Sequence, residues 1–141
     1  MKTCFRCGRD LPGSEFTRSY AKTCRDCLRV GRHVSKAKRR GMVANLTIEE
    51  WLETLEMFGY CCAYCGGSYR DLDHFVPIHY GGGTAFGNCL PACRPCNMAK
   101  ANINPMIGFP TNGLKPPVIG GRRGNPVNRA IAEGKIKGGE R

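Results

Sequence analysis

Four pairs of cysteines, each pair separated by two residues, constrain this chain more than any other feature of its sequence. The pairs are Cys4/Cys7 and Cys24/Cys27 near the N-terminus, and Cys62/Cys65 and Cys93/Cys96 further along. A Cys-x-x-Cys turn directs two thiolates at one point, and two such turns complete the tetrahedral four-sulfur site that suits Zn²⁺. The spacing therefore predicts two structural zinc sites. The alternative for a single pair is a thioredoxin-like redox motif, which needs a βαβ context that the sequence does not offer.

The cysteines also bear on the cellular setting. Ten of them occur in 141 residues, no run of about 18 apolar residues is present, and the first ten residues lack the apolar segment of a secretory signal. These features predict a cytoplasmic protein without a membrane partner, where reducing conditions favour metal-bound thiolates over disulfides. Cys61 and Cys89 lie outside the four pairs, and we expect both to pack as small buried hydrophobic residues.

The charge of the chain indicates a polyanionic partner. The formal charge is +11, for which nucleic acid is the first expectation and an anionic membrane surface the second. Residues 28–41 hold six Lys and Arg and no acidic residue, which predicts a basic helix or helical linker that ends near Gly41. Such a run repels itself unless it binds phosphates; a solvated charged surface is the alternative. The candidate contacts are Arg32, Lys36, Lys38, Arg39 and Arg40.

The composition divides the chain into four parts, and together they predict a small, zinc-stabilised α+β protein. Residues 1–27 form a zinc-knuckle module that folds on metal binding. Residues 28–59 hold the basic linker helix and an amphipathic helix, and residues 60–104 form a metal-clasped unit. Residues 105–141 are predicted to be a flexible basic tail, because 8 Gly and 5 Pro disfavour regular structure there.

The clearest predicted helix covers residues 47–58. Thr47 is its expected N-cap, and Glu50 completes a capping box. Ile48, Trp51 and Leu55 belong to an apolar stripe at helical spacing. Trp51 is therefore interpreted as a core residue and not as a platform for base stacking.

The second group of cysteines closes a long loop that predicts a ββα unit. Residues 69–76 alternate enough for a short strand, the glycine run 81–83 makes a wide turn, and residues 88–91 supply a returning strand. A helix is expected to start at the last cysteine pair, where Pro95 suits a first turn.

Three polar side chains of this unit are candidates for one chemical site. The hairpin is predicted to present Asp73 and His74 toward the helix that carries Asn97. A divalent cation and a nearby imidazole are sufficient for phosphodiester hydrolysis, because the metal stabilises developing charge while the base produces hydroxide.

The order and spacing of these motifs resemble the HNH (ββα-metal) endonuclease family. The resemblance covers about residues 60–102 and rests on Cys-x-x-Cys-Gly, Asp-His-x-x-Pro, the glycine run, Asn88 and Cys-x-x-Cys-Asn-x-x-Lys. The cysteines of residues 1–27 resemble, more loosely, the extra N-terminal zinc module of small phage and mobile-element members. The family often has histidine where this chain has Asn97, so the chain is similar to a His-Asn-Asn variant.

The resemblance implies a role for each site residue. Asp73 and Asn97 would hold a catalytic divalent cation, Mg²⁺ or Mn²⁺, through oxygen atoms. His74 would be the general base that deprotonates the attacking water, and Asn88 would brace the hairpin so that His74 stays aimed.

These observations predict a divalent-metal-dependent DNA endonuclease that hydrolyses phosphodiester bonds of double-stranded DNA, by nicking or by double-strand cleavage. Arg94 and Lys100 flank the site and are expected to contact phosphates. A non-catalytic zinc-ribbon DNA-binding protein is the alternative, because it also explains the charge and the cysteines. Phage DNA-processing or packaging proteins are candidate partners, and the cytoplasm of a bacterial or phage-infected cell is the expected location.

Overall fold

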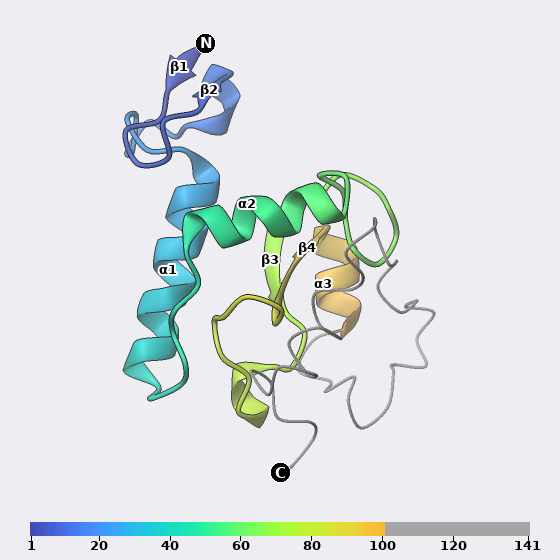
Figure 1. The fold of residues 1–141 in the computed structure, drawn as a ribbon. Helices are drawn as coiled ribbons and strands as arrows, with labels where there is room; N and C mark the ends of the chain where they lie inside the picture. Colours follow the sequence, from blue (N-terminus) through green and yellow to red (C-terminus); the bar gives the residue numbers. More distant parts are fainter. Residues whose placement is uncertain (101–141) are drawn as a thin grey trace.

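The computed structural model describes residues 1–100, and Figure 1 shows their arrangement. The predicted basic tail of residues 105–141 lies outside the described residues, as do the last residues of the predicted unit 60–104. Within the described part of the chain, no helix is both long and apolar enough to cross a membrane.

A two-stranded antiparallel sheet opens the chain. Strand β1 (Lys2–Thr3) pairs with strand β2 (Asp10–Leu11), and a short 3-10 helix, η1 (Gly13–Glu15), follows. The turn between the strands holds the first cysteine pair. Gly8 takes a φ of 73° in that turn, a conformation that glycine adopts without steric cost.

The predicted basic helix is present as α1 (Arg25–Arg39). It starts earlier than its composition indicated, because its N-cap is Cys24 and the helix therefore grows directly out of the first cysteine group. Just past its end, Gly41 has a φ of 69°, which fits the predicted helix end near that residue.

Helix α2 (Ile48–Met57) confirms the prediction made from its capping box. Thr47 Oγ1 accepts a hydrogen bond from the Glu50 backbone N–H at 3.1 Å, and a Glu50 carboxylate oxygen accepts from the Thr47 N–H at 3.1 Å. Trp51 and Leu55 are completely buried, so the apolar stripe faces the core as expected.

The predicted ββα unit is also present. Strands β3 (Asp71–His74) and β4 (Cys89–Ala92) form an antiparallel hairpin in which Asp71 is opposite Ala92 and His74 is opposite Cys89. The long connection between them contains a 3-10 helix, η2 (Ile78–Tyr80), and helix α3 (Arg94–Lys100) follows β4.

The glycine run 81–83 lets this connection fold back on itself. A Cβ atom at Gly82 would lie 1.7 Å from the backbone oxygen of Val76, so no other residue fits there without moving the chain. The close approach brings the connection against the start of the loop that follows β3.

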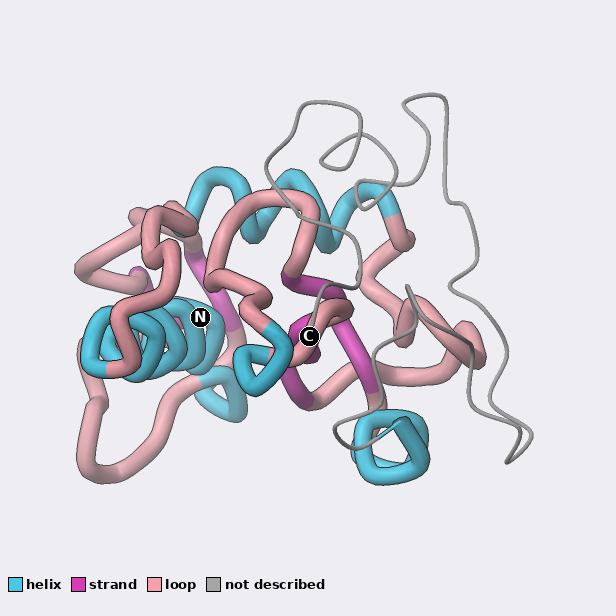
Figure 2. Tube along the Cα trace, turned by 90° about the horizontal axis from the view of Figure 1, so that it is seen from below, coloured by secondary structure: helices cyan, strands magenta, loops and turns pink. Residues whose placement is uncertain are grey.

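The hairpin lies between α1 and α3, as the two perpendicular views in Figures 1 and 2 agree. Both helices contact β3, while α2 packs against β4 and against α1. One hydrophobic core joins these elements, and its completely buried members include Trp51, Leu55, Val76, Cys89 and Leu90. Cys89 thus packs as predicted, whereas Cys61 is only half-buried.

Candidate active site and metal centres

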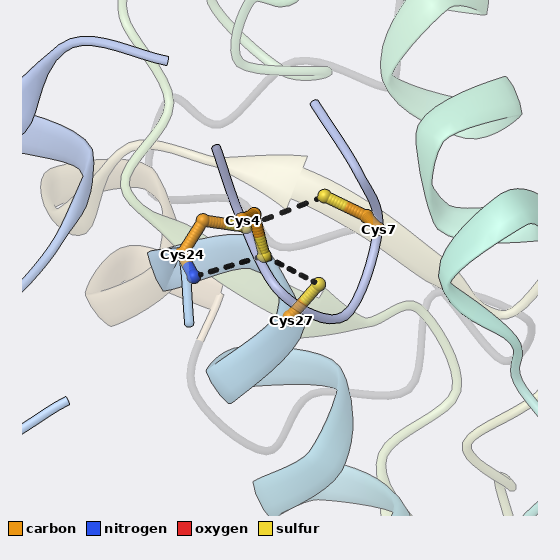
Figure 3. A group of neighbouring side chains, drawn as sticks. All are labelled: Cys4, Cys7, Cys24 and Cys27. Carbon is orange, nitrogen blue, oxygen red and sulfur yellow. Dashed lines mark hydrogen bonds between the residues drawn. The ribbon is translucent and has the colours of Figure 1, made fainter. Parts of the chain in front are cut away.

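The four N-terminal cysteines converge on one point, as Figure 3 shows. The Sγ atoms of Cys4, Cys7, Cys24 and Cys27 all lie within 4.8 Å of one another. The Arg9 guanidinium donates to Cys7 Sγ at 3.3 Å and to Cys24 Sγ at 3.5 Å, so a cation faces the sulfurs. Four converging sulfurs are the donor set of a closed structural site that could hold Zn²⁺.

Hydrogen bonds prepare one thiol of this group for ionisation. Burial alone raises the pKa of Cys4, but backbone N–H groups, that of Cys24 first, outweigh this and lower the pKa to about 6. A thiolate is the form that ligates a metal, so the backbone around Cys4 favours binding before any ion arrives.

The second group of cysteines lies at the base of the ββα unit. The Sγ atoms of its four members also lie within 4.8 Å of one another, and they are Cys62, Cys65, Cys93 and Cys96. Cys61 is excluded: its thiol donates to the Gly59 backbone oxygen at 3.3 Å instead. The prediction that Cys62 and not Cys61 belongs to the group is therefore confirmed, and this group too could hold Zn²⁺.

Asn88 ties the two ends of the hairpin connection together. It is 1% exposed, and its Oδ1 accepts from the Val76 N–H at 2.8 Å. Its Nδ2 donates to the Val76 backbone oxygen at 3.0 Å and to that of Gly83 at 2.9 Å. Three bonds from one buried amide hold the strand end against the glycine run, which is the contact pattern expected of a bracing residue.

Asp73 points toward α3, where its partner is Lys100. Lys100 Nζ lies 3.3 Å from Asp73 Oδ1 and donates to the His74 backbone oxygen at 2.7 Å. The Tyr64 hydroxyl donates to the other carboxylate oxygen, Asp73 Oδ2. Both oxygens of this buried carboxylate are therefore already in hydrogen bonds.

Lys100 requires a correction. It was expected to contact DNA phosphates, but its side chain is completely buried and its ammonium faces Asp73. A buried ammonium is stable only when it is paired, and Asp73 supplies the pairing charge here. Lys100 thus binds α3 to β3 and does not belong to the charged surface.

His74 points away from α3, which corrects the prediction that both hairpin residues face that helix. Consecutive side chains of a strand alternate between its two faces, so Asp73 and His74 separate. The His74 ring lies 5.1 Å from the His33 ring of α1, centroid to centroid, and its Nε2 is 2.8 Å from Thr84 Oγ1. Burial first, and then the positive charges of His33, Lys100 and Lys36, lower the pKa of His74 to about 3.

Asn97 lies beside Asp71, a residue that the sequence analysis did not single out. Asn97 Nδ2 donates to Asp71 Oδ2 at 3.3 Å. Asp71 is two residues before Asp73 and therefore lies on the same face of β3, a relation that the period of a strand could have indicated. The structure joins Asn97 to Asp71 and Asp73 to Lys100.

Asp71 and Asn97 line a cavity of about 820 Å³ between the N-terminal module, α1 and the ββα unit. His33 and five arginines line it too, and these arginines are Arg25, Arg29, Arg32, Arg70 and Arg94. Glu15 is a second acidic residue of the lining, so the cavity combines two carboxylates, an amide and an imidazole with a wall of fixed positive charge. Arg32 and Arg94 were predicted phosphate contacts; Arg70 and His33 were missed, because their proximity depends on how α1 packs against β3.

The other predicted phosphate contacts lie on the outer surface of α1. Lys36, Lys38, Arg39 and Arg40 are all exposed, as are Arg32 and Arg94. Residues 32, 36, 39 and 40 follow helical spacing and share one side of the helix. The basic residues of this run therefore lie on the surface of the folded chain.

Comparison with known proteins shows which family the ββα unit resembles. Residues 62–102 match the family model described as HNH endonuclease. The SPbeta prophage-derived protein YoqL of Bacillus subtilis (strain 168), whose name assigns it provisionally to the HNH endonucleases, is 31% identical over 68 residues; the match covers 40% of this chain and 30% of YoqL. The chain thus spans less than a third of that relative.

A solved structure has a similar fold. The rare-cutting HNH restriction endonuclease PacI superimposes with a TM-score of 0.55 at 24% identity, over 73% of this chain and 84% of that one. The resemblance extends beyond the ββα unit, because 73% of the chain is more than residues 62–102 contain. The cysteine-clasped ββα segment of this chain is thus the part that is similar to the HNH endonucleases.

Proposed function

We propose that this protein is a divalent-metal-dependent endonuclease that hydrolyses phosphodiester bonds of double-stranded DNA, with His74 as its general base. The observation that carries the proposal is the position of His74, half-buried at the end of β3 in the segment that matches the HNH family. Its low pKa, about 3, leaves the imidazole neutral at pH 7, as a proton acceptor must be.

Thr84 supports this role because it determines which ring nitrogen of His74 carries the hydrogen. The Thr84 hydroxyl donates its one hydrogen to the His33 backbone oxygen at 3.1 Å. Toward His74 the hydroxyl can then only accept, so Nε2 carries the ring hydrogen. In a neutral imidazole the lone pair then belongs to Nδ1, and we propose that Nδ1 takes the proton of the attacking water.

The backbone around Thr84 holds the hydroxyl in place. Thr84 is completely buried, its N–H donates to the Val43 oxygen at 2.8 Å, and its own carbonyl accepts from Asn45 and Leu46 at 3.0 Å. The loop between α1 and α2 thus fixes the residue that orients His74. A base held in this way needs little reorganisation during the reaction.

The divalent cation is proposed to bind beside Asn97. A bound Mg²⁺ or Mn²⁺ would stabilise the charge that develops on the phosphate oxygens. Asp73 and Asn97 are the proposed ligands, but Asp73 would have to exchange Lys100 for the ion. Asp71 forms no ion pair within residues 1–100, so it can supply a carboxylate oxygen next to Asn97, and we add it as a third candidate ligand.

Paired variants test the ligand assignment. Manganese binding to the full chain, followed by electron paramagnetic resonance, should weaken strongly in Asp71→Asn if Asp71 is a ligand. Asp73→Asn should mainly destabilise the fold, because it removes the charge that pairs with Lys100. Equal manganese affinity in Asp71→Asn and the parent chain would exclude Asp71.

A plasmid assay tests the proposed activity. The full chain should convert supercoiled plasmid to nicked or linear DNA only when Mg²⁺ or Mn²⁺ is added. His74→Ala should lose cleavage by about 10²- to 10⁴-fold, the usual contribution of a general base, and retain DNA binding. His79→Ala is the matched control, because His79 is an exposed histidine in the connection that follows β3, and it should cleave normally.

A second candidate function follows from the Asp73–Lys100 ion pair. If that pair never opens and Asp71 binds no metal, the chain is a DNA-binding zinc protein without activity. Parent and His74→Ala chains that bind DNA equally and leave the plasmid intact with either metal would establish this alternative.

The proposed setting is the cytoplasm of a bacterial or phage-infected cell. The prophage origin of YoqL supports a role beside phage DNA-processing or packaging proteins. Co-purification of the tagged chain from infected cells, with DNA digested beforehand, would identify such partners.

A further inference from the structure

A second groove lies beside the arginine-lined cavity, along the adjacent face of α1. Its volume is about 640 Å³, and its lining includes Arg6 and Tyr20 of the N-terminal module together with Arg32 and Arg39 of α1. Both hollows share Leu28 and Arg32, so these residues of α1 form a ridge between them. A surface thus runs from the ββα unit over α1 onto the N-terminal cysteine module.

The arginines of this groove differ from Arg9 and Arg29, which have an acidic partner. Arg9 and Arg29 form ion pairs with Asp26 at 3.2 and 2.9 Å. Among residues 1–100, by contrast, Arg6, Arg32 and Arg39 form no ion pair, and the groove lining contains no carboxylate. Like charges that gather without a counter-charge are favourable mainly when a polyanion neutralises them.

The groove is also shaped to expose its polar groups. Gly31 has no side chain, and a Cβ atom there would lie 3.2 Å from Arg6 Nη1, so the guanidinium of Arg6 lies close over α1. Tyr20 is 58% exposed, and its backbone is fixed in a turn by bonds from its N–H to the oxygens of Thr17 and from the Thr23 N–H to its own carbonyl. An exposed aromatic ring beside arginines is the combination that packs on nucleotides.

We infer that this groove binds the segment of DNA that flanks the cleavage site, so that the N-terminal cysteine module is a DNA-binding element in addition to a structural one. Arg6, Arg32 and Arg39 contact successive phosphates, and Tyr20 packs on a sugar or base at the end of the track. The inference rests on the proposed function, and it specifies that the substrate must extend beyond the ββα unit.

Substrate length gives a direct test. Helix α1 has 15 residues and is about 22 Å long at about 1.5 Å per residue, which corresponds to about 6 or 7 base pairs. Full-length His74→Ala protein, whose cleavage is strongly reduced under the proposal, should therefore bind a duplex of about 20 base pairs at least about tenfold more tightly than one of about 8. Fluorescence anisotropy at several salt concentrations provides both affinity and salt dependence.

Matched variants in the His74→Ala chain locate the contact. On the long duplex, Arg6→Gln should lose about three- to tenfold in affinity and reduce the salt slope by about 1, while the short duplex should show no change. Arg18→Gln removes the same charge from an exposed arginine outside both hollows and should change affinity less than twofold. Tyr20→Leu should weaken binding at least about fivefold, and Tyr20→Phe, which keeps the ring, should not.

The outcomes separate this inference from the proposed function. If Arg6→Gln and Arg18→Gln bind the long duplex equally, or if duplex length does not matter while wild-type protein cleaves plasmid, the groove inference is overturned and the nuclease proposal stands. If wild-type protein neither binds DNA nor cleaves it, both fall. A length-dependent affinity that is lost in Arg6→Gln and Tyr20→Leu supports the inference whether or not cleavage occurs.

Discussion

The buried carboxylate of Asp26, in the first turn of α1, accepts a hydrogen bond from the indole Nε1 of Trp51 in α2 at 3.2 Å. The same carboxylate receives Arg9 from the N-terminal module, Arg29 from α1 and the hydroxyl of Tyr69 from the segment before β3. One acidic side chain therefore joins the cysteine module, both long helices and the ββα unit. This junction positions the arginine-lined cavity, because its walls come from the same elements.

Asp26→Asn should destabilise the protein by about 2–3 kcal/mol. The neutral amide has only one acceptor oxygen and leaves two guanidinium groups without their counter-charge, and hydrogen bonds to charged groups contribute about 1.5–3 kcal/mol. Urea unfolding followed by Trp51 fluorescence measures the change. Glu56→Gln, an exposed carboxylate of α2, is the control and should stay within about 0.5 kcal/mol of the parent.

Thr84→Val should reduce cleavage by about 10- to 100-fold, because His74 loses the acceptor that fixes its ring hydrogen. Thr84→Ser keeps the hydroxyl and should restore most activity. Nitrogen-15 NMR of the imidazole should show the Nε2–H tautomer in the parent and a mixture in Thr84→Val. If Thr84→Val unfolds more easily but keeps the parent tautomer and the parent cleavage rate per folded molecule, Thr84 acts only by packing.

Lys100→Met should cost about 3–5 kcal/mol of unfolding free energy, because it leaves the buried carboxylate of Asp73 without its ion-pair partner. The double variant Lys100→Met/Asp73→Asn should recover much of that loss, since neither charge remains. Lys38→Met, at an exposed position of α1, should have little effect. Urea denaturation of the parent chain, Lys100→Met, Asp73→Asn and the double variant gives the coupling between Lys100 and Asp73, and a value near zero would contradict the ion pair.

The free energy of unfolding should fall as the pH decreases from 6.5 to about 4, in part because of His33. Burial first, and then Lys36, Arg32 and Arg29, lower the pKa of His33 to about 4, while Asp71 partly opposes this; the His74 ring also lies against it. The unfolded chain then binds more protons than the folded one, so the contribution of His33 is complete above pH 6.5 and lost as pH falls toward 4.

His33→Phe keeps a ring and removes this titration. It should flatten the decline by about 1–2 kcal/mol over that interval. In the parent chain, the Nδ1 atom of His33 has no hydrogen-bond partner among the described residues, so the substitution removes little hydrogen bonding. The measurement is urea unfolding at a series of pH values, and identical slopes in the two proteins would show that His33 titrates normally in the fold.

Cys93→Ser should lower the bound zinc from two ions to one per chain and unfold the ββα unit, because the cluster that holds the ends of the loop loses one of its four sulfurs. Cys61→Ser is the matched control, since Cys61 lies next to a cluster member but outside the cluster, and it should retain both ions. Elemental analysis with circular dichroism tests both variants. Full zinc content in a folded Cys93→Ser protein would disprove the ligand assignment.

The sequence by itself determined the local features of this protein. Cysteine spacing predicted that each set of four cysteines converges, the pair Thr47 and Glu50 predicted the start of α2, and the motif order predicted a ββα unit. These features succeed because each depends on residues that are close in sequence or that one shared metal site must bring together. The part of the chain that matches the HNH family is the part in which such motifs are densest.

Only the tertiary structure decided which neighbouring element each site residue of β3 contacts. The alternation of β3 sends Asp73 to Lys100 and His74 to Thr84 and His33, and the packing of α1 against β3 places Asp71 in the cavity of arginines. Motif spacing along a strand records the distance between residues but not which neighbouring element covers each face. The packing of the common core decides which element covers each face of the strand. It makes Lys100, which was expected at the surface, the buried partner of Asp73.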